Sequence, residues 1–277
     1  MMGKIITMNT FLVKTAALIA LGVTLAIAGC APSTEIETAE TNRVRIGTEG
    51  AYPPFNYVNA NGNLAGFDVD IANALCTAAK LECEFVIQDW DGIIPGLLAK
   101  KYDAIVASMS ITEERKRKVD FTKKYYHMAS KFVAKKGSTF EFTPQGLSGK
   151  SVAVQRGTLH ERLLRDTFPG VSLKLFDTQD EANSSLAAGH ADLVMASAVM
   201  LLEGFLKTRD GADFEFVGPN WRDARYHGRG VAIAVRKTDS ELRETLNQAI
   251  DQIRADGTYQ WINDEYFPFD IYGGPEN

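Results

Sequence analysis

The sequence predicts an α/β protein built as two similar lobes with a ligand cleft between them. Two successive blocks of the chain alternate short apolar, strand-like segments with helical segments, which is the pattern of a parallel sheet covered by helices. The length of 277 residues suffices for two domains of ordinary size. A content of 45% hydrophobic and 23% charged residues is typical of globular proteins. In such sheets ligands collect at the carboxyl ends of the strands, so residues just after the strands are the functional candidates.

The first block reads strand, helix, strand, helix, strand. The expected elements are a strand at residues 44–48, a helix at 67–75, a strand at 84–87, a helix at 91–99 and a strand at 104–107. Asn61-Gly62 marks a tight turn before the first helix. Asp68 or Asp70 is placed to cap the free N–H groups of that helix.

The second block repeats this order. We expect strands at residues 151–154, 173–176 and 192–195 and helices at 160–166 and 180–188. Residues 189–193 match residues 101–105 in role, because each segment ends a helix and places an Asp before an apolar strand. A strand at 230–235 then returns the chain to the first lobe, and helices at 240–255 and 258–266 complete it.

The N-terminus has the anatomy of a secretory signal that ends in a lipobox. Lys4 and Lys14 flank an apolar stretch, residues 15–29, and residues 27–30 read Ile-Ala-Gly-Cys. We therefore predict a lipoprotein signal peptide at residues 1–29, acylation of Cys30 and a flexible tether at 30–42. The protein is then a membrane-anchored periplasmic lipoprotein, on the inner or the outer membrane. The alternative is a membrane anchor helix that is never cleaved.

Two cysteines remain for the folded part of the chain. Cys76 lies near the end of a predicted helix and Cys83 at the start of the next strand, and an oxidising compartment favours a disulfide between them. Such a bridge would stabilise the fold by about 2–3 kcal/mol in the chain-entropy model. The alternative is two buried free thiols. We expect no metal site, because no His or third Cys has ligand spacing nearby.

Charge and hydropathy exclude several classes of protein. With 30 basic and 35 acidic residues and no long basic block, the chain lacks the electrostatic footprint of a nucleic-acid-binding protein. After the leader, no apolar run approaches the about 20 residues that span a bilayer, so the chain is not a channel or a permease. The four histidines form no catalytic or metal-binding pattern, and no cofactor is expected.

Several segments taken together carry a family resemblance. They are residues 47–55 (GTEGAYPPF), 66–70 (GFDVD), 103–115 (DAIVASMSITEER), 154–158 (VQRGT), 203–207 (EGFLK), 254–259 (RADGTY) and 266–274 (YFPFDIYGG). The sequence resembles the polar amino-acid-binding proteins of ABC uptake systems, the family 3 solute-binding proteins, close to the lysine/arginine/ornithine and histidine binders. The resemblance covers nearly all of residues 43–274 and implies a monomer of two lobes, joined by two hinge crossings, that closes around its ligand and delivers it to a permease. We assign residues 43–127 and 232–277 to lobe 1 and residues 128–231 to lobe 2.

The resemblance also implies which residues of lobe 1 contact the ligand. Arg115 would bind the α-carboxylate, since a guanidinium matches a carboxylate with two hydrogen bonds. The hydroxyl and N–H groups of the segment Ser108, Met109 and Ser110 would complete this cage. Tyr52 and Trp90 would sandwich the ligand side chain, and Glu49 would meet its distal cation.

In lobe 2, Gln155 and Thr158 match contact positions of the family, and His160 is placed to bond a polar ligand tail. Gly157 allows close approach to a helix N-terminus that favours an anion. Ser197 stands where amino-acid binders usually carry the Asp that pairs with the α-ammonium, and a desolvated ammonium without a partner is costly.

Three functions remain open at this level. The first is capture of an arginine-like, lysine-like or ornithine-like amino acid. The second is capture of an arginine-derived opine or another N-substituted amino acid, because opine binders also have Glu, Trp and small residues at comparable places. The third is an enzyme resembling the cyclohexadienyl dehydratases, which share this fold and would need Glu49 or His160 as general acid or base. We expect a binding protein, not an enzyme.

Overall fold

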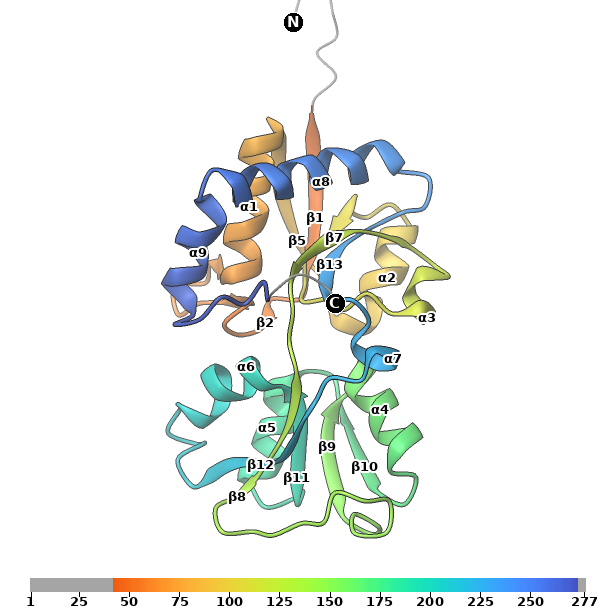
Figure 1. Cartoon of the computed structure of the whole chain (residues 1–277), viewed down its shortest axis with the longest axis vertical. Coiled ribbons are helices and arrows are strands. Elements are labelled where there is room, and N and C mark those ends of the chain that lie inside the picture. The colour runs from red at the N-terminus through yellow and green to blue at the C-terminus, as the bar shows by residue number, and fades with distance from the viewer. Residues whose placement is uncertain (1–41, 274–277) are drawn as a thin grey trace, which may run out of the picture. The chain divides into compact units, whose positions relative to one another are not determined.

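The structure is a computed structural model that describes residues 42–273. It contains two five-stranded sheets and one small three-stranded sheet (Figure 1). The predicted signal peptide and the acylation at Cys30 lie outside the described residues. Within residues 42–273, no helix is long and apolar enough to cross a membrane.

The first large sheet has the strand order β5-β1-β6-β13-β7. Its strands are β1 (Arg43–Thr48), β5 (Glu82–Ile87), β6 (Ala104–Ile105), β7 (Asp120–Tyr126) and β13 (Val231–Val235). The strands β5, β1 and β6 are parallel, as the sequence predicts, whereas β13 runs antiparallel to both β6 and β7. The sheet is therefore mixed, because its last two strands do not come from strand–helix–strand units.

Helices α1 (Phe67–Ala79), α2 (Trp90–Leu98), α8 (Ser240–Ala255) and α9 (Thr258–Tyr266) accompany this sheet (Figure 1). A short helix, α3 (Glu113–Lys116), follows β6. Between β1 and α1 the chain forms the small sheet of β2 (Ala51–Tyr52), β3 (Asn56–Val58) and β4 (Leu64–Ala65), of which the sequence indicated only the turn. Its Phe55 ring stacks on Tyr126 at 5.1 Å between centroids, which anchors the small sheet to the core. We call this assembly lobe 1.

The capping role expected of Asp68 or Asp70 is wrong. Helix α1 begins after Gly66, and no side chain caps it. Asp68 instead points into the interior, fully buried, and accepts hydrogen bonds from Asn56 Nδ2 (2.8 Å), Ser108 Oγ (2.9 Å) and Tyr125 OH (2.7 Å). Burial raises the pKa of this carboxyl. The acid thus ties together three separate segments of lobe 1.

The second large sheet has the order β10-β9-β11-β8-β12. Its strands are β8 (Ser130–Lys135), β9 (Ser151–Gln155), β10 (Ser172–Phe176), β11 (Leu193–Ser197) and β12 (Phe214–Trp221). Helices α4 (Leu159–Thr167) and α5 (Gln179–Ala187) join the parallel strands, and α6 (Ala198–Leu201), the π-helix η1 (Leu202–Leu206) and α7 (Ala224–His227) follow. The strand β8 is antiparallel to β11 and β12, so this sheet is also mixed. We call this assembly lobe 2.

The chain passes between the two large sheets twice, from β7 to β8 and from β12 to β13. Both crossings occur next to antiparallel strands. The return to lobe 1 at β13 was expected from the sequence, whereas the strands β8 and β12 were not. The α/β fold class predicted from the sequence is confirmed.

The predicted disulfide between Cys76 and Cys83 is present, with a Cα–Cα distance of 6.1 Å. It joins the last turns of α1 to the start of β5 across a loop in which Lys80 takes the left-handed conformation (φ 55°). The bridge therefore fixes one helix of lobe 1 to the edge strand of its sheet.

Candidate ligand-binding site

A small cavity of about 30 Å³ collects side chains from both lobes. Nine of the eleven predicted ligand-contacting residues line it, and so do Ala107 and Leu159, which the sequence analysis did not single out. The nine are Glu49, Tyr52, Trp90, Ser108, Ser110, Arg115, Gln155, Thr158 and His160. Residues from four segments far apart in the sequence, 49–52, 90, 107–115 and 155–160, thus meet where strands end.

Arg115 is held in place by its own short helix. Thr112 caps α3 by accepting a hydrogen bond from the Arg115 N–H (3.2 Å), and the guanidinium Nη1 donates to the Ser110 carbonyl oxygen (3.1 Å). The guanidinium also lies 5.1 Å from the centroid of the Trp90 ring. Burial lowers the pKa of Arg115 to about 10. Within residues 42–273 it forms no ion pair, so this desolvated cation has donors to offer an anion.

Glu49 follows β1 and is only 6% exposed. Its carboxyl accepts a hydrogen bond from Gln155 Nε2 of lobe 2. Burial raises the pKa of Glu49 to about 7, although the Gln155 bond lowers it, and the negative charges of Asp180 and Asp89 raise it further. No basic side chain in the described part of the chain forms an ion pair with Glu49. A ligand cation would therefore meet an acid without a counter-charge.

Trp90 and Tyr52 supply the aromatic walls. Trp90 is the first residue of α2, and its Nε1 donates to the Gly157 carbonyl of lobe 2 (3.2 Å). Tyr52 is buried beside Phe55, with ring centroids 6.1 Å apart, and its hydroxyl bonds to Ser197. The two rings flank the space next to Arg115 and Glu49.

The serines after β6 are not equivalent. Ser108 takes the left-handed conformation (φ 52°) and donates its hydroxyl proton to Asp68. Its oxygen is thus left to the cavity as an acceptor, which suits an ammonium better than a carboxylate. Ser110 uses its carbonyl for Arg115, and no such constraint applies to its hydroxyl.

Lobe 2 contributes neutral groups. The Thr158 hydroxyl caps α4 by accepting from the Glu161 N–H (3.3 Å), and it donates to the Gln155 carbonyl (2.7 Å). Glu161 also accepts from the Gly157 N–H (2.8 Å), so the anion favoured at this helix N-terminus is supplied by the protein itself. Burial, with the charges of His227 and Arg115, lowers the pKa of His160 to about 3, which keeps its imidazole neutral at physiological pH.

Two predicted residues do not line the cavity. Ser197 is buried at the end of β11, where its hydroxyl donates to Met128 Sδ (2.7 Å), and it is hydrogen-bonded to Tyr52. Met109 packs in the apolar cluster with Ile93 and Leu97. Its apolar side chain was the available signal against a role in the polar site.

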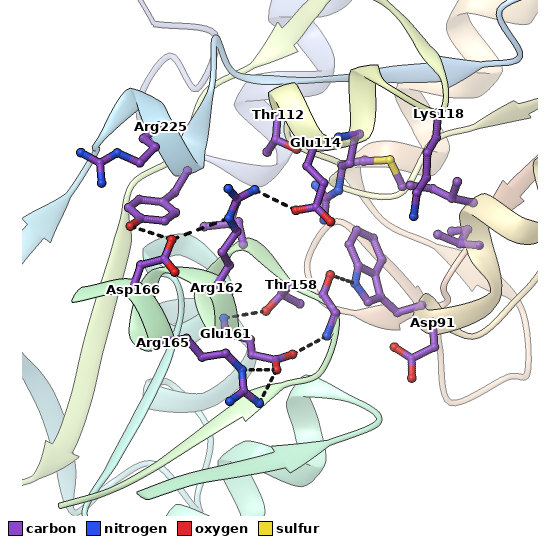
Figure 2. A pocket seen from close by; sticks show the side chains of 18 of the residues that line it. Asp91, Thr112, Glu114, Lys118, Thr158, Glu161, Arg162, Arg165, Asp166 and Arg225 are labelled. Atoms are coloured by element: carbon purple, nitrogen blue, oxygen red, sulfur yellow. Dashed lines mark hydrogen bonds and ion pairs between the residues drawn. The ribbon is translucent and has the colours of Figure 1, made fainter. Parts of the chain in front are cut away.

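A larger groove of about 440 Å³ adjoins the cavity (Figure 2). Trp90, Arg115, Thr158 and Leu159 line both spaces. Ion pairs of 2.8 Å cross or flank the groove, Arg162 to Glu114 between the lobes and Arg165 to Glu161 along α4 (Figure 2). Two further cations that line the groove, Lys118 and Arg225, form no ion pair within the described residues. Nor do residues 42–273 contain a His, Cys, Asp and Glu cluster able to hold a metal ion.

Two α/β assemblies are joined by two chain crossings, and residues of both line one cavity. This arrangement defines the class of two-lobed solute-binding proteins. The chain belongs to family 3 of the bacterial extracellular solute-binding proteins, which it matches over residues 44–269.

Its relatives are amino-acid binders. The L-arginine-binding protein of Pseudomonas aeruginosa is 51% identical over 232 residues, which are 83% of this chain and 90% of the relative. The histidine-binding periplasmic protein of Escherichia coli K12 is 42% identical over 233 residues, again 83% of this chain and 90% of the relative. An ancestral arginine-binding protein solved with arginine has a TM-score of 0.76 at 37% identity, over 82% of this chain and 98% of its own. These relatives are named as binding proteins, which favours a binding function over the dehydratase alternative.

Proposed function

We propose that this chain is the periplasmic solute-binding component of an ABC uptake system and that it captures an arginine-like amino acid. One observation carries the proposal. The same small cavity holds the Arg115 guanidinium and the buried Glu49 carboxyl, and neither forms an ion pair with any of residues 42–273. A ligand with an anion at one end and a cation at the other satisfies both charges, and burying either charge unpaired is costly.

The aromatic residues fix how such a ligand would lie. Its α-carboxylate would bind Arg115, its alkyl stem would pass between Tyr52 and Trp90, and its distal cation would reach Glu49. Neutral groups of lobe 2, such as Gln155, would close over the ligand. The amino acids for which the relatives are named, arginine and histidine, agree with this polarity.

The test is a calorimetric titration of the purified protein with arginine, lysine, ornithine, histidine and the opine octopine. We expect a saturable heat with arginine and a weaker response to lysine, because a planar guanidinium can share two hydrogen bonds with a carboxylate. Absence of binding by any of these ligands would contradict the proposal.

A second candidate, an arginine-derived opine, is favoured by one specific observation. The cavity continues past Trp90 and Arg115 into the groove of Figure 2, where Lys118 and Arg225 have no acidic partner within the described residues. A ligand whose α-nitrogen carries a second carboxylate could extend there. Such a ligand also has less need of an acid at Ser197.

The substitution Ser197→Asp separates the two candidates, since Ser197 lies next to Tyr52, which lines the cavity. If arginine is the ligand, the new carboxylate pairs with its α-ammonium and tightens binding by about tenfold, as a charge-assisted hydrogen bond would. If octopine is the ligand, two anions come together and binding weakens. Ser197→Asn is the matched uncharged control. Unchanged affinities for both ligands would show that Ser197 does not face the ligand.

We further propose that the protein is held at the membrane by acylated Cys30 and that the hinge crossings divide the lobes at residues 127–128 and 231–232. Labelling of cells with a radioactive fatty acid tests the first point. Incorporation should be lost in Cys30→Ala, and incorporation that persists would disprove acylation at this residue.

A further inference from the structure

A second concave region lies at the edge of the first large sheet, beside β7. This groove encloses about 550 Å³ and shares no lining residue with the ligand cavity or with the groove of Figure 2. Its walls come from β7, from the loop before β13 and from α8. Five basic side chains and one acidic side chain line it, namely Lys116, Lys123, Lys124, Arg229, Arg243 and Asp120. In a chain whose net charge is −5, this concentration of cations is unusual.

Three of these cations are neutralised by neighbouring acids. The ion pairs are Lys116 with Glu113 (2.8 Å), Lys123 with Asp251, and Arg243 with Asp120 (2.8 Å). Lys124 and Arg229 form no ion pair with any residue of the described range 42–273. The groove therefore offers two positive charges in excess.

Lys124 is the unusual member of the set because it is buried, with 9% of its surface exposed. Its ammonium lies 5.0 Å from the centroid of the Tyr272 ring, and Arg254 stacks on the same ring. A cation–π contact satisfies an ammonium only in part. Because Lys124 forms no ion pair within the described residues, its ammonium remains able to bind an anion.

The backbone next to Lys124 is shaped to admit its side chain. Gly230, with φ 120°, lies against Lys124, and a Cβ at this glycine would lie 3.1 Å from both Cβ and Cδ of Lys124. Arg229, the other unpaired cation, directly precedes Gly230. Lys124 of β7 and Arg229 of the loop before β13 both line the groove.

Protection of the sheet edge is the simpler explanation for lysines on β7, because edge strands commonly carry Lys to discourage pairing with other chains. β7 is indeed an edge strand. The exposed Lys123 suits that purpose, but a buried lysine cannot shield an edge from solvent-borne partners.

We propose that this groove is a second binding site, separate from the amino-acid cavity, for a phosphate group, with Lys124 at its base and Arg229 at its rim. Two unpaired cations, one ammonium and one guanidinium, match the two charges of a phosphate monoester or of free phosphate. A single carboxylate would neutralise only one of them. A phospholipid headgroup is a diester with one negative charge and fits less well.

The experiment uses the full chain purified in a nonionic detergent and titrated calorimetrically at low salt. The probes are inorganic phosphate, glycerol 3-phosphate and the diester glycerophosphoglycerol. Lys124→Met removes the charge but keeps an alkyl stem against Gly230 and Tyr272, and Arg229→Gln tests the rim. Lys101→Met is the matched control, because it removes the charge of an exposed lysine on another part of lobe 1.

We expect saturable binding of phosphate and of the monoester, weakened about tenfold or more in Lys124→Met, weakened less in Arg229→Gln and unchanged in Lys101→Met. Stronger binding of the diester than of the monoester would identify the source as a phospholipid headgroup while retaining Lys124 as the base of the site. Absence of saturable binding by all three probes, or equal binding by the wild type and Lys124→Met, would overturn the proposal. Arginine binding by Lys124→Met should stay at the wild-type level, which shows that the variant folds and keeps the two sites distinguishable.

Discussion

In lobe 1 the first strand, β1, leads into the small sheet of β2, β3 and β4 before the helix α1 begins, whereas in lobe 2 the equivalent strand, β9, runs almost directly into α4. The two large sheets otherwise share one strand order, with the first strand between the second and the third and two antiparallel strands beyond. The insertion places Tyr52 in the cavity, and no counterpart exists in the described part of lobe 2.

This difference extends to the chemistry of the cavity. Lobe 1 supplies the ionisable groups with unpaired charge, Glu49 and Arg115, and both aromatic walls. Lobe 2 supplies an amide, a hydroxyl that is already bonded, and an imidazole whose low pKa keeps it neutral. We therefore propose that lobe 1 selects the ligand and that lobe 2, which has the same topology, closes over it.

The largest expected effect comes from removing charge on the lobe 1 side. Arg115→Met should weaken arginine binding by more than about a hundredfold, because breaking one side of a buried ion pair costs about 3–5 kcal/mol. Gln155→Met, on the lobe 2 side, should cost about tenfold or less, as for a neutral hydrogen bond. Calorimetry on both variants measures the ratio, with Arg117→Met as the control for an exposed cation of the same segment. A larger loss for Gln155→Met would reverse the proposed roles of the lobes.

The next effect concerns the free energy of unfolding. In both lobes an Asp side chain binds a backbone N–H of the first strand, but the two interactions differ in strength. Asp103 and Asp192 each precede the third strand and accept a backbone N–H of the first strand, from Arg45 (3.1 Å) and Ser151 (2.8 Å). Asp103 also binds the guanidinium groups of Arg45 and Arg236, both at 3.0 Å, which lowers its pKa, although burial acts against this shift.

We expect Asp103→Asn to lower the free energy of unfolding by about 2–3 kcal/mol, since hydrogen bonds to charged groups are lost. Asp192→Asn, at an exposed site that forms no ion pair within the described residues, should cost about 1 kcal/mol or less. Urea denaturation of the ligand-free protein measures both. Equal losses would mean that Arg45 and Arg236 do not increase the stabilisation that Asp103 provides.

The repeated Asp before the third strand of each lobe was visible in the sequence. Many of the hydrogen bonds within the site were not. Residues 101–105 and 189–193 match as a local pattern, and local patterns of period and turn also predicted the parallel strands and their helices. The antiparallel strands β8, β12 and β13 pair residues far apart in the chain, and only β13 was expected. The placement of Asp68 failed for the same reason, because its three donors come from other segments.

Residue types at the site were predicted better than their roles. Family motifs placed nine residues at the cavity. They could not show that the Thr158 hydroxyl caps α4 or that the Glu161 carboxylate binds at the N-terminus of this helix. Those outcomes depend on competition between neighbouring donors and acceptors, which only the assembled structure decides. The charge state of Glu49 likewise depends on its burial.

That charge state makes ligand binding depend on pH. With its pKa raised to about 7 by burial, Glu49 is largely protonated below pH 7 and must lose the proton to bind a cation. Arginine affinity should therefore fall by about tenfold between pH 8 and pH 6, because one unit of pKa corresponds to about 1.4 kcal/mol. Glu49→Gln should bind more weakly at pH 8 and show no such slope, and Glu84→Gln is the exposed control. Titration in buffers of different ionisation enthalpy should detect proton release at pH 6, and its absence would show that Glu49 does not meet the cation.

The same shift has the opposite consequence for the ligand-free protein. The folded state holds the Glu49 proton to higher pH than the unfolded state, so stability falls as pH rises from about 4.5 to about 7. Ligand that pairs with the ionised carboxyl should remove this loss.

The smallest expected effect concerns an ion pair that joins the two lobes. The pair Glu114–Arg162 (2.8 Å) joins α3 to α4, but both side chains are nearly half exposed, at 49% and 45%, so water screens their attraction. A double-mutant cycle of Glu114→Gln and Arg162→Gln, read in arginine affinity, should give a coupling of about 0.5 kcal/mol, equivalent to about a two- to threefold change in Kd. The pair Glu161–Arg165 has the same 2.8 Å separation but lies within α4, so its attraction is equal in open and closed lobes and its cycle should show no coupling to affinity. Salt near 1 M should abolish the first coupling by screening. Equal coupling in both cycles would mean that the interlobe pair does not report closure, and that lobe 2 closes through its neutral contacts alone.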